Sequence, residues 1–133
     1  MRFPYREIEP GKFGPVVDVH LFNRTRSFCV DAFIDSGADF SVFDISSASL
    51  IGLKYKEGRK IPITVGDGDR MIAYRHEVPV LFSGRRFVVP ICFSEYLGAG
   101  FNLLGRAGFF DRFVICFHEK ERYTSVMPVG KII

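Results

Sequence analysis

Short runs of β-branched and aromatic residues, each followed by residues typical of turns, recur along most of this chain. Such runs fit pleated strands, and several at close spacing predict an all-β barrel or sandwich. The run at 71–82 is the longest; we expect Pro79 to interrupt it and Ser83-Gly84 to form a tight hairpin behind it. The sequence predicts strands at 16–22, 27–34, 61–65, 71–82, 86–93, 113–117 and 123–127.

Helical signals are scarce in this sequence. Residues 44–51 form the best candidate, because Asp44 or Ser46 can cap the first turn and Gly52 can end the helix. A second short turn is expected at 106–110. The predicted fold is therefore an all-β barrel with one or two short helices.

The length of 133 residues fits a single domain, residues 1–133, which can bury about two-thirds of its unfolded surface. Apolar residues make up 47% of the chain, so a packed core is possible and a disordered chain is excluded. Residues 1–13 are expected to form an N-terminal arm and residues 128–133 a C-terminal tail.

Charge and hydropathy narrow the range of partners. The 18 basic and 15 acidic residues give a net charge of +3, which is too small to indicate nucleic acid. No run approaches the ~18 apolar residues of a membrane span, and the N-terminus lacks the apolar stretch of a signal peptide. We therefore expect a cytoplasmic protein with no nucleic-acid and no membrane partner.

The three cysteines, Cys29, Cys92 and Cys116, each lie inside an apolar run, and none has metal-ligand spacing to another. We expect three buried free thiols in strands, which suits a reducing compartment. His76-Glu77 lacks the second histidine of a zinc-peptidase helix. No metal and no cofactor are therefore expected.

The stretch most informative about chemistry is an apolar strand that runs into Asp35-Ser36-Gly37. A carboxylate at a strand end costs free energy unless hydrogen bonds compensate it. The Ser36 hydroxyl and the Gly37 backbone can supply such bonds, and glycine permits a tight turn. By itself the tripeptide is a weak signal, because an ordinary strand-end turn uses the same residues.

A second stretch, residues 103–106 (Leu-Leu-Gly-Arg), strengthens this signal. Together with residues 35–38 (Asp-Ser-Gly-Ala), it resembles the retropepsin-like aspartic proteases. In that family an apolar strand leads into Asp-Thr/Ser-Gly-Ala, and a later apolar pair precedes Gly-Arg. The resemblance covers residues 14–118 and is nearer to small prokaryotic members than to viral ones. It implies a closed acid-protease barrel with one lobe per chain.

The resemblance implies roles for the residues of the first motif. Asp35, Ser36 and Gly37 match the catalytic motif, in which Asp35 is the catalytic aspartate and the Ser36 hydroxyl braces two active-site loops across a dimer. Gly37, Ala38 and Asp39 match positions that contact the substrate.

Asp39 also matches the residue that pairs with the arginine of the Gly-Arg motif, here Arg106. A guanidinium can hold a carboxylate through two parallel hydrogen bonds, which would fix the active-site loop against the later residues. The alternative is two unrelated surface charges.

Members of the family cover the site with a glycine-rich β-hairpin flap, and residues 63–70 are the candidate for it. Val65, Gly66, Asp67 and Gly68 would form the tip that meets the substrate. A plain surface turn is the alternative.

The implied reaction is peptide hydrolysis by water activated between two carboxylates, one ionised and one protonated. The aspartate motif occurs once, so the site has to form between two chains that each contribute Asp35. Residues 3–5 and 129–133 are the further dimer contacts expected by resemblance. The expectation is a homodimeric aspartic endopeptidase acting on peptides or proteins. Alternatives are a catalytically silent dimer that binds peptides in the same cleft, and a barrel with an accidental Asp-Ser-Gly.

Overall fold

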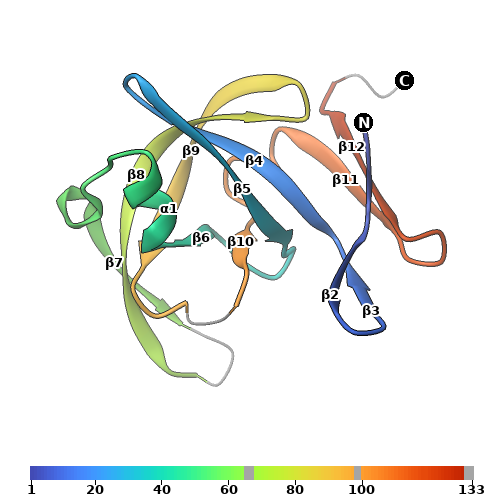
Figure 1. Ribbon diagram of the computed structural model, residues 1–133, viewed down its shortest axis with the longest axis horizontal. Coiled ribbons are helices and arrows are strands. Elements are labelled where there is room, and N and C mark those ends of the chain that lie inside the picture. Colours follow the sequence, from blue (N-terminus) through green and yellow to red (C-terminus); the bar gives the residue numbers. More distant parts are fainter. Residues whose placement is uncertain (65–67, 98–99, 131–133) are drawn as a thin grey trace.

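The computed structural model describes residues 1–64, 68–97 and 100–130, which form a β-barrel with a smaller sheet beside it (Figure 1). Six strands form a ring in the order β4-β5-β10-β6-β9-β8, and β8 also pairs with β4. This last pairing closes the ring, so the predicted closed all-β barrel is confirmed. The ring strands are β4 (Val16–Asn23), β5 (Arg26–Ile34), β6 (Ser41–Asp44), β8 (Arg70–Phe82), β9 (Arg85–Ser94) and β10 (Asn102–Leu104).

Alternate residues of the ring strands point inward and build the core, as the two-residue period of a strand requires. In β4, Val17, Val19 and Leu21 are fully buried, whereas the intervening Asp18 is exposed. The alternation that predicted the strands is therefore the alternation that fills the barrel.

A tight turn joins β8 to β9, the longest antiparallel pair of the barrel. Ser83 and Gly84 form this turn with φ angles of 52° and 76°. Positive φ at both central residues is what a two-residue type I′ hairpin needs, so the predicted hairpin is confirmed.

Pro79 does not interrupt β8, contrary to the expectation. On one edge of β8, β7 (Arg59–Thr64) pairs as far as Arg75 and β4 pairs at Val80 and Leu81. Pro79 lies in the gap between these two pairings, where β9 is the neighbour of β8, so the missing N–H of proline is tolerated.

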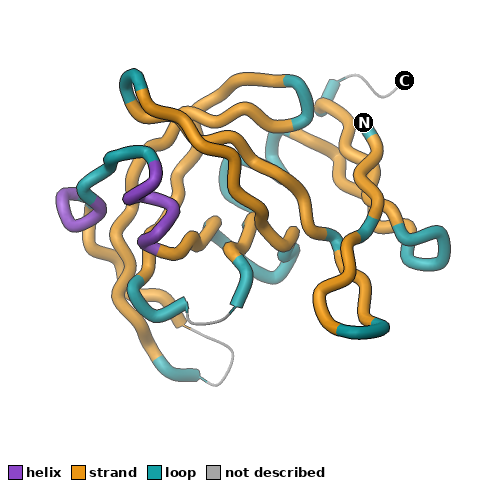
Figure 2. The backbone as a smooth tube through the Cα atoms, in the orientation of Figure 1, coloured by secondary structure: helices purple, strands orange, loops and turns teal. Residues whose placement is uncertain are grey.

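In the part of the chain that the structure describes, helical structure is limited to two short segments within residues 45–57 (Figure 2). The predicted helix is α1 (Ile45–Leu50); the Asp44 carboxylate accepts a 2.9 Å hydrogen bond from the Ser46 N–H, and Gly52 follows with a φ of 67°. A 3₁₀ turn, η1 (Tyr55–Glu57), comes next and was not expected. Residues 106–112 form successive turns and no helix. In the described part of the chain, no helix has the length and apolar character needed to cross a membrane.

The smaller sheet has three strands in the order β1 (Arg2–Pro4), β12 (Tyr123–Pro128) and β11 (Phe113–His118). Its inner face packs on the barrel through aromatic rings: Phe113 meets Phe82 edge-on at 5.4 Å between ring centroids. A separate hairpin of β2 (Arg6–Glu9) and β3 (Lys12–Gly14) leads into the barrel.

Residues 1–13, the expected N-terminal arm, form strands within their own chain. β1 pairs with β12 of its own chain, and the ring of Phe3 stacks on Phe82 with centroids 5.7 Å apart. Tyr5 is only 8% exposed. Burial of these two aromatic side chains against the rest of the chain is favourable, because it removes their apolar surface from water.

The cysteines correct one expectation. Cys92 is fully buried, as predicted, but Cys29 and Cys116 are exposed free thiols. In β5 the inward-facing positions are Val30, Ala32 and Ile34, and in β11 they are Phe113 and Ile115. Cys29 and Cys116 fall on the opposite face of their strands, so both thiols point outward. An apolar run around a residue does not reveal which face that residue takes.

Candidate active site

The two motifs that are far apart in sequence meet at one edge of the barrel. β10 runs parallel to β5 with Leu104 opposite Ile34, so both strands end side by side. The chain continues into Asp35 from one strand and into Gly105 from the other. The Asp35 N–H donates a 2.9 Å hydrogen bond to the Leu104 carbonyl, which ties the two strand ends together.

The Asp35 carboxylate is half-buried and is held by the turn that follows it. The Gly37 N–H donates to Asp35 Oδ1 at 2.9 Å, and the Ala38 N–H donates to the Asp35 carbonyl at 3.2 Å. Ser36 lies exposed at the tip of this turn, and Ala38 is half-buried.

Gly105 makes the closest backbone approach in the site. A Cβ atom at this position would overlap the carbonyl group of Phe40 and crowd the carbonyl oxygen of Ala38, so only glycine fits. The Gly105 N–H donates to the Ser41 Oγ at 3.0 Å, and Ser41 is fully buried. The sequence carried no signal for this role of Ser41, since the bond joins residues far apart in the chain.

Asp39 and Arg106 are brought together, but through one contact and not through the expected pair of parallel hydrogen bonds. Arg106 Nη1 lies 3.7 Å from Asp39 Oδ1, and the two side chains are 60% and 83% exposed. An ion pair so exposed contributes at most about 1 kcal/mol. The backbone holds the loop instead: the Arg106 N–H donates to Ala38 O at 2.8 Å and the Ala107 N–H to Asp39 O at 2.9 Å.

A cavity of about 610 Å³ opens beside Asp35. Its walls are mostly apolar and come from the Asp35 turn, β6, β7, β8 and β10. β7 contributes four consecutive residues, 61–64, of which Ile61 and Ile63 are half-buried and Pro62 and Thr64 are exposed. The lining residues are Asp35, Gly37, Ala38, Asp39, Phe40, Val42, Ile61, Pro62, Ile63, Thr64, Met71 and Leu103.

The hairpin expected to cover the site is formed by β7 and β8, which extend from the barrel in Figure 1. The last described pair is Thr64 opposite Arg70, and Gly68 has a φ of 88°. Residues 65–67, the predicted tip residues Val65, Gly66 and Asp67, lie outside the described residues.

No protein-family model and no curated protein matches this sequence. A solved structure does: the EIAV protease in complex with the inhibitor HBY-793 superposes with a TM-score of 0.53 at 22% identity, covering 70% of this chain and 82% of that one. The fold is retropepsin-like. At this identity the likeness concerns the fold alone. Among residues 1–64, 68–97 and 100–130, no group of three or more His, Cys, Asp or Glu side chains is arranged to hold a metal ion.

Proposed function

We propose that the protein is a homodimeric aspartic peptidase in which the Asp35 carboxylates of two chains activate one water molecule. The observation that carries this proposal is the place of Asp35. Asp35 follows the buried Ile34 at the end of β5, its carboxylate accepts a hydrogen bond from Gly37, and it lines a mostly apolar cavity of about 610 Å³. A cavity of this size fits peptide side chains.

The chemistry requires a second carboxylate within a few ångströms of the first. Two such groups cannot both ionise easily, so the pair retains one proton. The ionised carboxylate takes a proton from water, and the protonated one donates to the oxygen of the scissile carbonyl. The attacking oxygen adds to the carbonyl carbon. The carboxylate that took the proton from water then passes it to the nitrogen of the intermediate, and the C–N bond breaks as the amine leaves.

The second carboxylate comes, in this proposal, from the Asp35 of a second copy. β1 already pairs with β12 in its own chain, so we expect the second copy to meet the exposed turn at Ser36 and Gly37 directly. The apolar residues Ile61, Ile63 and Met71 would favour peptides with apolar side chains at the cleaved bond.

The test is cleavage of a diverse peptide mixture, followed by mass spectrometry from mildly acidic to neutral pH. Asp35→Asn removes the ionisable group but keeps an oxygen that can accept the Gly37 hydrogen bond. Asp31→Asn is the matched control, because Asp31 is an exposed residue of β5, the strand that leads into Asp35. We expect cleavage by the wild type and by Asp31→Asn, and none by Asp35→Asn.

Two results would contradict the proposal. Equal cleavage by the wild type and Asp35→Asn would assign the activity to a contaminant. Saturable peptide binding without cleavage would favour a silent peptide-binding dimer. Sedimentation across a range of concentrations gives a separate check, since a chain that stays monomeric with bound peptide cannot pair its Asp35 residues.

A further inference from the structure

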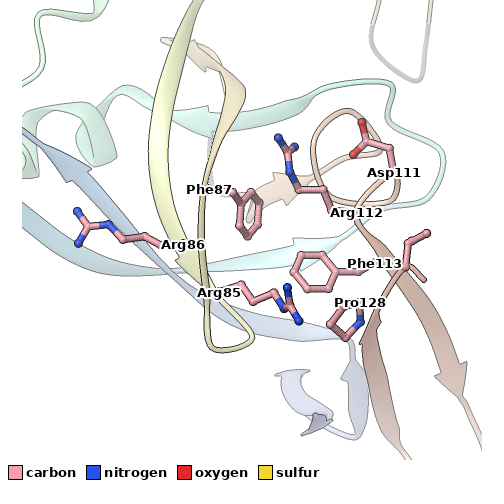
Figure 3. A pocket seen from close by; sticks show the side chains of 8 residues that line it. Arg85, Arg86, Phe87, Asp111, Arg112, Phe113 and Pro128 are labelled. Carbon is pink, nitrogen blue, oxygen red and sulfur yellow. The ribbon is translucent and has the colours of Figure 1, made fainter. Parts of the chain in front are cut away.

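A second cavity, of about 500 Å³, lies between the start of β9 and the smaller sheet (Figure 3). It shares no lining residue with the cavity at Asp35. Its size falls in the range of small-molecule sites. The lining residues are Arg85, Arg86, Phe87, Asp111, Arg112, Phe113, Pro128 and Val129.

Arg112 is fixed in place at this cavity. Its Nη1 donates a 3.0 Å hydrogen bond to the Gly108 carbonyl, and its guanidinium carbon lies 5.1 Å from the centroid of the Phe87 ring. A guanidinium has five N–H donors in a rigid fork, so further donors remain for a ligand. Because the side chain is already ordered, a ligand bound here need not order it again.

Arg85 supplies the second cation. It follows the Ser83-Gly84 turn directly, and its side chain extends beside Phe113 and Pro128 (Figure 3). Within the described part of the chain, the Arg85 side chain forms no ion pair and no hydrogen bond. Its charge is therefore not neutralised by any of those residues.

The neighbouring arginine is directed elsewhere. The Arg86 guanidinium lies 4.0 Å from the centroid of the Phe22 ring, and its side chain points away from Arg85 and Arg112 in Figure 3. Asp111 is the one acidic residue that lines the cavity, and it forms no ion pair with any described residue. With the Arg86 guanidinium over Phe22 left aside, Arg85, Arg112 and Asp111 give the cavity a net charge of +1.

The floor of the cavity is apolar and aromatic. The rings of Phe87 and Phe113 lie 5.5 Å apart between centroids, and Pro128 continues this surface. Phe113 is only 2% exposed, so the floor is fixed by the core. Cationic donors over such a floor suit a ligand that combines an anionic group with an apolar body.

We propose that this cavity binds a small organic carboxylate whose single negative charge is held by Arg85 and Arg112 while its apolar or aromatic body lies on Phe87 and Phe113. The Asp111 carboxylate disfavours a dianion such as phosphate, because it repels a second negative charge in the same cavity. This site is independent of the chemistry proposed for Asp35.

The test is a titration of the full chain with N-acetyl-phenylalanine, followed by amide and arginine side-chain NMR signals. We expect saturable shifts at Phe87, Phe113 and the Arg112 Nε–H, weakened by added salt. N-acetyl-phenylalanine amide, which lacks the charge, is the neutral control. Inorganic phosphate tests whether the anion suffices without an apolar body.

Two variants test whether Arg85 binds the carboxylate. Arg85→Gln removes a side chain that has no ion pair or hydrogen bond with described residues, and we expect it to weaken binding about tenfold or more while thermal unfolding stays unchanged. Arg86→Gln, which alters the outward-pointing neighbour, is the matched control and should bind as the wild type does.

Several outcomes would overturn the proposal. These are equal affinity for the acid and its amide, phosphate binding as tight as that of the aromatic acid, an equal loss in Arg85→Gln and Arg86→Gln, or no saturable shift at millimolar concentrations. Each is read from the same spectra.

Discussion

The amide of Asp35 donates a 2.9 Å hydrogen bond to the carbonyl oxygen of Leu104, the last residue of β10. The acidic turn is therefore attached to a strand that lies far away in sequence. Its position depends on how closely the chain after Leu104 can approach the chain around Phe40. Backbone contacts, and not side-chain charges, maintain the site.

Gly105 is the residue most sensitive to substitution in this arrangement. Gly105→Ala would push a methyl group into the carbonyl of Phe40, a backbone group that cannot rotate aside. We expect a loss of about 1–3 kcal/mol in the free energy of unfolding, measured by urea denaturation. Peptide cleavage should fall with it, even under conditions where the protein stays folded. An unchanged urea midpoint would contradict this, because it would mean that the backbone around Phe40 shifts to accommodate the methyl group at no cost.

The neighbouring Arg106 should behave differently. Arg106→Gln removes an exposed contact of 3.7 Å to Asp39 but leaves the backbone hydrogen bond from residue 106 to Ala38. We expect the free energy of unfolding to change by less than about 1 kcal/mol, with little dependence on salt. Urea denaturation at low and high ionic strength measures this. A loss as large as that of Gly105→Ala would mean that the ion pair, and not the backbone, holds the loop.

The three thiols should differ in reactivity. Burial raises the pKa of the Cys92 thiol to about 11, whereas Cys29 and Cys116 are exposed. The thiolate is the reactive form, so iodoacetamide at neutral pH should modify the two exposed cysteines and spare Cys92 until the protein is unfolded in urea. Peptide mapping by mass spectrometry assigns the modified sites. Modification of Cys92 in the native protein at the rate seen in urea would contradict this.

Tyr55, the first residue of η1, should make the free energy of unfolding depend on pH at high pH. The Tyr55 hydroxyl donates a hydrogen bond to the Glu95 carboxylate, which raises the pKa of Tyr55 from 10.0 to about 12. Because the pKa is higher in the folded state, this contribution to stability is fully present below pH 10 and is lost as the pH rises through about 12.

Comparison with Tyr55→Phe isolates that contribution. The wild type should exceed the variant in unfolding temperature below pH 10, and the difference should shrink as the pH approaches 12. Thermal unfolding followed by circular dichroism measures both. A difference that stays constant or grows over this range would exclude the assigned hydrogen bond as its cause.

The longer strands, α1 and the hairpin turn could all be predicted from sequence because their signals are local. Asp44 caps the helix it precedes, and Ser83-Gly84 reverses the chain between two apolar runs. β6 and β10 could not be found this way. They are four and three residues long, and their hydrogen bonds come from strands distant in sequence.

The candidate site, too, could be predicted from the sequence only in part. The motif around Asp35 and the Gly105-Arg106 pair are visible in sequence, and the structure brings them together. The support from Ser41 and the lining from Met71 are not visible, because each acts on residues that only the closed barrel brings near it. The direction of Cys29 was misjudged because composition does not fix the register of a strand.

The insertion of β10 between β5 and β6 also sets the order of events during synthesis. A ribosome that has released only the first half of the chain carries Asp35 without the strand that braces it. The turn can acquire its final shape only after residues 102–107 have emerged, so a nascent chain is unable to present a finished acidic centre to its surroundings.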